Sequence, residues 1–303
     1  MRFSVWPSFQ RPWVELVALA RTIDAGPWHG LWYADHLMPN TEDGSPIDGE
    51  AFECWTVLAG LAAITSRVRP GSLVSPVTFH HPVVLAKRAT TVDHISGGRA
   101  VLGLGAGWQI NEHAAIGVEL PPPGERVRRF EEAIEIVTRV RTERRVTTDG
   151  THFVATDLPF DPKPVQHRLP VMVGTAGQRM LGITARWADE WNTWGDPDTV
   201  AEATARFRAA CEREHRDPDG IHRSAQALVF MTPDDATTDK LRGRTPAGRS
   251  LVGTSAQLVD LVGAYVELGL DELIVPDFTL GTTASERADT LAAFAEQVLP
   301  AFA

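Results

Sequence analysis

Residues 95–108, Ile-Ser-Gly-Gly-Arg-Ala-Val-Leu-Gly-Leu-Gly-Ala-Gly-Trp, are the stretch on which the interpretation of the fold depends. The two glycines at 97–98 are typical of a helix end, because glycine adopts the left-handed cap conformation without steric cost. The apolar residues 100–104 then predict a short strand, which runs directly into three small residues at 105–107. These leave the backbone open at the strand end, and Trp108 adds a flat side chain beside it. We expect a ligand to bind there, with a plain glycine turn as the alternative.

The same alternation of strand and helix extends outward from this stretch in both directions. Short apolar runs predict strands at residues 2–6, 30–34, 68–74, 100–104, 171–174, 189–194, 224–231 and 271–275. Periodic segments between them predict about as many helices, for example at 13–25, 52–65, 124–143, 177–187, 197–215 and 284–302. Roughly eight strands alternating with eight helices favour an α/β (β/α)8 TIM barrel as a single domain over residues 1–303.

Three further features refine this prediction. Thr-Asp-Gly at 148–150 predicts a hairpin insertion near 145–156. The polar, aperiodic residues 232–250 predict a long lid-like loop. A doubly wound open sheet is the alternative architecture, but the first strand–helix turn lacks a Gly-x-Gly-x-x-Gly sequence.

The composition narrows the class of partner and the compartment. A net charge of −10 without a basic stripe argues against nucleic acid as a partner. Cys54 and Cys211 are distant in sequence and form no Cys-x-x-Cys motif, which fits a reducing cytoplasm. No signal peptide or membrane-spanning run is recognisable, so we expect a cytoplasmic protein with no membrane partner.

Because a barrel carries its active site at the carboxyl ends of its strands, those ends supply the candidate residues. They include aromatic and small residues and few acids, which suits a planar, aromatic, anionic ligand more than a metal. A second glycine-containing junction, Gly174-Thr175-Ala176-Gly177, precedes a helix. Its backbone N–H groups and the helix dipole predict a phosphate site, with a plain turn as the alternative.

Several segments resemble the bacterial luciferase-like flavin and deazaflavin oxidoreductases, and the acidic, Ala- and Arg-rich composition resembles the branch that uses coenzyme F420. The segments are Trp-Tyr-Ala-Asp-His at 32–36, Pro82 to Arg99, Gly-Leu-Gly-Ala-Gly-Trp at 103–108, Ala-Asp-Glu-Trp-Asn at 188–192, Gly-Thr-Ser at 253–255 and Val-Leu-Pro at 298–300. The resemblance implies a TIM-barrel oxidoreductase that transfers hydride between reduced F420 and a small organic substrate. An FMN-dependent luciferase-like monooxygenase is the alternative.

The resemblance also implies roles for individual residues. The family often has a non-proline cis peptide beside the ring, which maps to Ser72-Leu73. The residues expected to contact the cofactor are Ser72, Leu73, Ser75, Gly105, Ala106, Gly107, Trp108, Gly174, Thr175, Ala176 and Gly177. Asp35 and His36 map to the catalytic pair near the ring.

One position departs from part of the family. Its sugar-phosphate dehydrogenases have a glutamate where this chain has Trp108, and the nearest acid is Glu112. This departure favours a reductase or a monooxygenase over sugar dehydrogenation.

For the chemistry, His36 is the preferred proton donor, because histidine titrates near neutral pH. A structural hydrogen bond to Asp35 or to the backbone is the alternative role. Trp6, His80 and Trp194 are expected to line the substrate pocket, with helix capping by His80 and ordinary rim packing of the tryptophans as alternatives.

A weaker alternative is a metal-dependent barrel hydrolase that uses Asp35, His36, His80 and His81. It is disfavoured because the other strand ends lack the acids that complete such a site, and we expect no metal. A non-catalytic flavin-binding relative is also open. The expected partners are a small-molecule substrate and, from the resemblance, a second copy in a homodimer.

Overall fold

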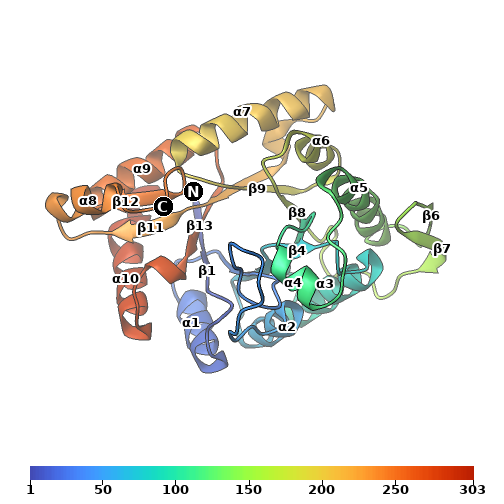
Figure 1. The fold of residues 1–303 in the computed structure, drawn as a ribbon, viewed down its shortest axis with the longest axis horizontal. Coiled ribbons are helices and arrows are strands. Elements are labelled where there is room, and N and C mark those ends of the chain that lie inside the picture. The colour runs from blue at the N-terminus through green and yellow to red at the C-terminus, as the bar shows by residue number, and fades with distance from the viewer.

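A parallel sheet that curves into a barrel forms the centre of the computed structural model, which describes residues 1–303 (Figure 1). The strands neighbour one another in the order β3-β2-β1-β13-β10-β9-β8-β5-β4, and a bridge between Gly71 and Val101 brings β3 against β5. β3 and β4 are two halves of one barrel position, so nine strands fill eight positions. The barrel strands are β1 (Arg2–Trp6), β2 (Gly30–Tyr33), β3 (Arg69–Ser72), β4 (Ser75–Pro76), β5 (Leu102–Gly105), β8 (Val171–Gly174), β9 (Glu190–Trp194), β10 (His222–Gln226) and β13 (Glu272–Pro276). The predicted TIM barrel is confirmed.

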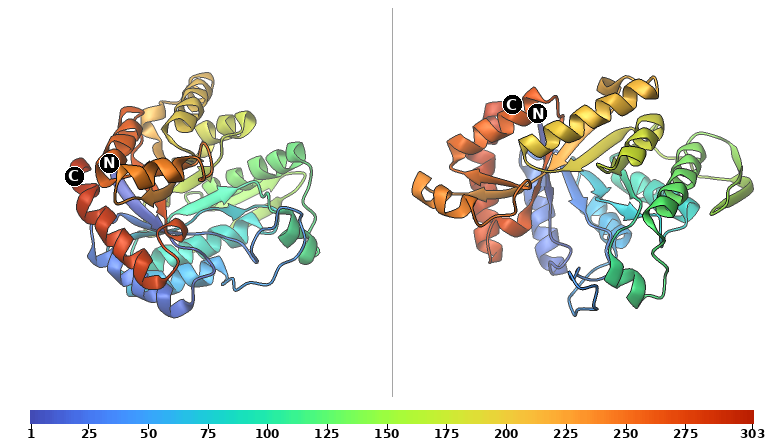
Figure 2. Two further views of the ribbon diagram at one scale, coloured as in Figure 1. Left: turned by 60° about the vertical axis from the view of Figure 1, so that its left-hand side comes forward. Right: turned by 45° about the horizontal axis from the view of Figure 1, so that its top comes forward.

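Helices surround this barrel on its outer face, as the views in Figures 1 and 2 show. The ten helices of the chain are α1 (Trp13–Ala25), α2 (Cys54–Ile64), α3 (Pro82–Ser96), α4 (Ile110–Ala115), α5 (Pro123–Val140), α6 (Gln178–Trp187), α7 (Pro197–Arg213), α8 (Asp235–Arg242), α9 (Ser255–Glu267) and α10 (Ala284–Gln297). Two of them are not part of this outer layer, because α4 lies at the open end of the barrel and α8 packs on β12 (Ser250–Gly253). Short 3-10 turns lie at Pro218–Gly220, Asp277–Thr279 and Leu299–Phe302. No helix combines the length and the apolar character that crossing a membrane requires.

Alternation along the strands divides the buried residues into two layers. Val5, Leu31, Val173 and Leu273 belong to a large cluster between the strands and the helices. A smaller cluster, Trp32, Leu73, Val101, Met172 and Ile274, has Trp6 and Val74 packed against it. Because successive side chains of a strand point to opposite faces, the small cluster fills the inside of the barrel. Leu73 and Trp6 thus lie at the border between the filled interior and the open end.

At the amino ends of the strands, the interior is closed by charged side chains. Glu272 is fully buried and accepts hydrogen bonds from Trp32 Nε1 and His222 Nε2, both at 2.9 Å. Arg69 forms an ion pair with Glu190 across the same end. We call His29, Arg69, Glu190, His222 and Glu272 the barrel floor. Burial opposes the charge on Glu272, but its bond to His222 and the nearby cations lower its pKa to about 2.

Three segments differ from the expectation. The strand expected at 224–231 is split at Ala227 into β10 and β11 (Leu228–Met231). Residues 232–250 are not one irregular loop, because they contain α8, whose first turn is capped by Asp234 through Thr237 N. β11 pairs in parallel with β12 (Ser250–Gly253) in an accessory sheet outside the barrel. The sequence did not indicate α4.

An antiparallel hairpin of β6 (Arg145–Asp149) and β7 (Val154–Pro159) projects from the barrel after α5. Figure 1 shows it at the edge of the molecule, in pale green. None of its residues lines the cavity at the open end of the barrel, which is described below.

Candidate active site

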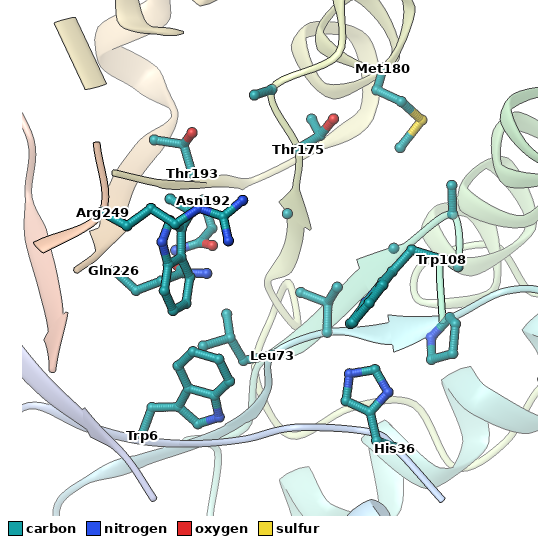
Figure 3. Close-up of a pocket in the computed structure, with 18 of the residues that line it drawn as sticks. Trp6, His36, Leu73, Trp108, Thr175, Met180, Asn192, Thr193, Gln226 and Arg249 are labelled. Carbon is teal, nitrogen blue, oxygen red and sulfur yellow. The ribbon is translucent and has the colours of Figure 1, made fainter. Parts of the chain in front are cut away.

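The carboxyl ends of the barrel strands surround a cavity of about 840 Å³, which 22 residues line (Figure 3). Its wall is built mostly from strand ends. The contributions are Trp6 from β1, Leu73 and Val74 from the break between β3 and β4, Gly105–Trp108 from the end of β5 onward, Gly174–Ala176 from the end of β8 onward, Asn192–Trp194 from β9 and Gln226 from β10. We call this cavity the mouth of the barrel.

Most of the expected cofactor and pocket residues do line the mouth. They are Leu73, Gly105, Ala106, Gly107, Trp108, Gly174, Thr175 and Ala176, together with Trp6, Trp194 and His36. Five expected residues do not line it, namely Ser72, Ser75, Gly177, Asp35 and His80.

The two serines act within the chain rather than in the cavity. Ser72 Oγ donates to Gly103 O at 2.9 Å and accepts from Gly103 N at 3.1 Å. Ser75 Oγ accepts from Trp55 Nε1 at 3.0 Å, and both serines are fully buried. They fasten the two halves of the third barrel position to β5 and α2. The non-proline cis bond lies between Leu73 and Val74, so its expected position at Ser72-Leu73 is wrong by one residue.

Asp35 and His80 pair with each other instead of facing the mouth. Asp35 is buried, and its Oδ2 lies 2.9 Å from His80 Nε2. His80 Nδ1 in turn lies 3.2 Å from Arg88 of α3. The pair thus connects the end of β2 to the start of α3, and it gives the buried carboxylate of Asp35 a hydrogen-bond partner.

The four residues of the hydrolase alternative do not converge. His81 caps α3 by accepting from Val83 N, while Asp35 and His80 pair outside the cavity. No three His, Cys, Asp or Glu side chains of the structure are arranged to hold a metal ion.

His36 has a partner that the sequence did not indicate. Its Nδ1 lies 3.1 Å from Glu112 Oε1, and Leu37 N donates to Glu112 Oε2 at 3.0 Å. Glu112 belongs to α4 and is only 1% exposed, so its carboxylate is buried below the mouth. A carboxylate on Nδ1 favours the tautomer that carries its proton on Nδ1. Nε2 makes no hydrogen bond with the protein. His36 also contacts Trp108 edge to face, at 5.5 Å between ring centroids.

The wall around Leu73 and Val74 depends on glycine. A Cβ added at Gly105 would lie 2.6 Å from Val74 Cγ2, and one added at Gly174 would lie 3.1 Å from Val74 Cγ1. The glycines of β5 and β8 therefore let the apolar Leu73-Val74 segment stand directly in the cavity wall.

Polar atoms of the mouth lack partners in the protein. Trp6 Nε1, Thr193 Oγ1, Trp194 Nε1 and Gln226 Oε1 are all buried without a hydrogen bond. Such groups are rare in folded proteins, because each costs about 1–3 kcal/mol when left unpaired. The first turn of α6 likewise has no side-chain cap at Gly177. The mouth thus combines an apolar wall, donors and acceptors without partners, and a helix N-terminus without a side-chain cap. This combination fits a planar heteroaromatic group with a phosphate.

Some lining residues were missed by sequence reasoning, among them Met180, Thr199, Gln226 and residues 247–249. Gln226 was hidden because the split of the seventh strand was not recognised. The residues at 247–249 reach the mouth only through the accessory sheet, for which the sequence gave no pattern.

The comparisons with known proteins agree with this geometry. Residues 1–245 match the family model described as luciferase-like monooxygenase, so the chain belongs to the luciferase-like monooxygenase family. The family expected from the sequence motifs is thereby confirmed.

Individual relatives cover most of the chain. An uncharacterized protein of Mycobacterium tuberculosis is 36% identical over 236 residues, which cover 76% of this chain and 80% of that protein. An F420-dependent glucose-6-phosphate dehydrogenase of Microbacterium testaceum is 27% identical and covers 89% of this chain and 88% of its own length. The solved F420-dependent secondary alcohol dehydrogenase has a TM-score of 0.82 at 16% identity and covers 100% of this chain and 99% of its own, which establishes a shared fold.

Proposed function

We propose that this protein is a coenzyme F420-dependent oxidoreductase. The observation that carries the proposal is the pairing of His36 with Glu112 beside the apolar Leu73-Val74 wall, which leaves Nε2 of the histidine available at the mouth. The F420-dependent relative that spans most of the chain supports the choice of cofactor.

Several residues of the mouth fit the parts of such a cofactor. Leu73 and Val74 offer an apolar face for the ring, and the small residues 105–107 and 174–176 leave room beside it. The uncapped first turn of α6 provides backbone N–H groups for a phosphate. Trp108 and His36 would border the ring on the side of α4.

Bound F420 supplies a carbon that donates or accepts hydride. The protein supplies the proton and the orientation. Nε2 of His36 accepts a proton from a substrate that is oxidised, and the protonated ring donates it to a substrate that is reduced. Glu112 holds the ring in the required tautomer and stabilises the imidazolium through Nδ1. Trp6 and Trp194 narrow the other side of the mouth and limit the access of water.

The second candidate is an FMN-dependent monooxygenase, which the description of the matched family favours. The two functions differ in the ring system that the same wall must accept. The test is a side-by-side titration of the purified protein with F420 and with FMN, followed by ligand fluorescence. Saturable binding of F420 without binding of FMN is the expected result. Binding of FMN alone would transfer the protein to the second candidate, and binding of neither would contradict both.

We infer further that the protein works in the cytoplasm as a homodimer. Both cysteines are free and buried, which suits a reducing compartment. A groove between α2 and α3 has ten lining residues, of which half are apolar, among them Val83 and Val84. Val84 is 49% exposed, so a second copy would cover apolar surface there. Light scattering over a range of concentrations would test the dimer, and a monomer at every concentration would contradict it.

A further inference from the structure

The ionisable side chains of the mouth differ in whether they have a partner within the protein. His36, Glu112 and Arg249 are the residues with ionisable side chains that line it. His36 and Glu112 are partners of each other through their 3.1 Å contact. The guanidinium of Arg249 makes no hydrogen bond and no ion pair with the protein, although guanidinium has five N–H donors. In a chain of net charge −10, the mouth therefore presents one cation without a partner in the protein.

Arg249 belongs to an aromatic end of the mouth. Its Cζ lies 5.9 Å from the centroid of the Trp194 ring, and Trp194 meets Trp6 edge to face at 5.5 Å. Figure 3 shows Arg249, Gln226 and Trp6 on one side of the cavity and His36 and Trp108 on the other, with Leu73 between them. We call Trp6, Trp194, Gln226 and Arg249 the aromatic end.

The backbone of Arg249 is held at the mouth rather than left on a free loop. Leu228 N donates to Arg249 O at 2.8 Å, which joins it to the start of the accessory sheet. Asp196 N donates to Gly248 O at 3.0 Å, which fixes the preceding residue to the N-terminus of α7. A cation on a backbone that is fastened on both sides loses less conformational entropy when it binds a ligand.

The other polar groups of the aromatic end are also mostly donors. The indole N–H groups of Trp6 and Trp194 are buried without acceptors, and an indole can only donate. Gln226 has an unpartnered Oε1, and its amide presents either an acceptor or two donors depending on its orientation. The two indole N–H groups and the guanidinium of Arg249 therefore lack acceptors, which the oxygens of an anionic group provide.

We propose that the aromatic end binds the carboxylate of an organic acid substrate, with Arg249 as its ion partner. This proposal rests on the proposed function, because the substrate must lie beside the cofactor. Guanidinium matches a planar carboxylate through two parallel hydrogen bonds, and the indole faces accept an apolar or aromatic body attached to it. Acidic groups of the cofactor have a separate site in the uncapped first turn of α6, after Gly174–Ala176.

The experiment measures two affinities in three proteins. F420 is titrated into the wild type and into Arg249→Gln and Arg244→Gln. A panel of 2-hydroxy acids that includes mandelate, each with its methyl ester, is then titrated into each F420 complex. Arg244 is the matched control, because it lies in the same segment and is exposed like Arg249 but does not line the mouth, while its loss changes the net charge by the same amount.

The expected result has two parts. In the wild type, at least one acid binds more tightly than its ester, and Arg249→Gln weakens that acid about 30-fold while the ester is unaffected. F420 affinity stays the same in all three proteins, and Arg244→Gln behaves like the wild type.

Three results would overturn the proposal. Acids that bind no better than their esters to the wild type would show that no carboxylate is recognised. An acid preference that survives Arg249→Gln would assign the carboxylate to other groups. A loss of F420 affinity in Arg249→Gln alone would assign Arg249 to the acidic tail of the cofactor. Failure of the wild type to bind F420 at all contradicts the proposed function instead, so the two failures are distinguishable.

Discussion

The floor and the mouth of the barrel differ in how their polar groups are paired. On the floor, Arg69 pairs with Oε1 of Glu190, and Glu272 bonds to His222 and Trp32, while only Oε2 of Glu190 has no partner among these carboxylate oxygens. At the mouth, Arg249 has no ion partner, and the indoles of Trp6 and Trp194 have no acceptor. The two regions lie at opposite ends of the same strands, so the difference in pairing reflects different functions. We infer that the floor groups serve stability and that the mouth groups are left for ligands.

His36→Gln should give the largest loss of activity. Loss of a general acid or base lowers kcat by about 10²–10⁴-fold, and the lining of the mouth contains no second histidine to replace it. Steady-state turnover of F420 with the accepted acid measures the loss, and thermal unfolding and F420 affinity serve as controls. A variant with unchanged kcat would remove His36 from proton transfer.

His222→Gln should have the opposite profile, with a loss of stability and unchanged F420 affinity. Removal of one partner of a buried ion pair costs about 3 kcal/mol, because Glu272 keeps its charge in the interior. Urea unfolding of both proteins measures the difference in the free energy of unfolding. An equal loss of F420 affinity would show that the floor and the mouth are not separable.

The stability that His222→Gln loses should also depend on pH. Burial opposes the charge on His222, but its bond to Glu272 and the nearby carboxylates raise its pKa above 6.5. Its contribution to stability is therefore complete below about pH 6.5 and is lost as the pH rises through the raised pKa. The pKa of Glu272 falls from 4.5 to about 2, so its contribution is complete above about pH 4.5 and is lost as the pH falls towards 2.

The stability gap between wild type and His222→Gln should thus be largest between about pH 4.5 and 6.5 and should narrow at alkaline pH. His29 acts in the other direction, since burial lowers its pKa to about 4, but it is present in both proteins. Unfolding curves at several pH values would check the window. A gap that grows with rising pH would contradict the sign.

Glu112→Gln should cause a smaller loss of activity than His36→Gln. The amide keeps the contact to Leu37 N but no longer stabilises an imidazolium, so kcat should fall about 30-fold. Because Glu112 acts through His36, the pH–rate profile should also shift, which a purely structural role would not produce. Retention of the wild-type profile would contradict this positioning role.

Arg145→Gln, in the hairpin, should have the smallest effect of the series. The Arg145–Asp157 pair is 2.8 Å long, but both side chains are well exposed, at 46% and 71%. Water and salt screen such a pair, so the free energy of unfolding should change by less than about 0.5 kcal/mol and activity should not change. A larger loss of stability would show that the exposure of an ion pair does not predict how little it contributes to the stability of this protein.

Much of the barrel was predictable from the sequence, because apolar strands and periodic helices leave a local pattern. The helix at 13–25 and the strand ends at Trp6, Gly105 and Gly174 were obtained in this way. Asn192–Trp194 also lie where strand ends in a barrel must lie, around one mouth.

What the sequence could not indicate were contacts between distant segments. Glu112 reaches His36 only because α4 folds back under the mouth, and Asp35 turns away from it to satisfy His80. Arg249 arrives through the pairing of β11 with β12, a parallel contact between strands about 20 residues apart. Each depends on tertiary geometry that no local periodicity records.

The most direct measurement is a crystal structure of the protein with F420 and an acid that it accepts. The account predicts that the deazaflavin ring contacts Leu73 and Val74, that the cofactor phosphate lies near Gly174–Ala176, and that the carboxylate of the acid pairs with Arg249. A complex with the phosphate or the acidic tail of F420 on Arg249, or with the ring away from Leu73, would contradict it.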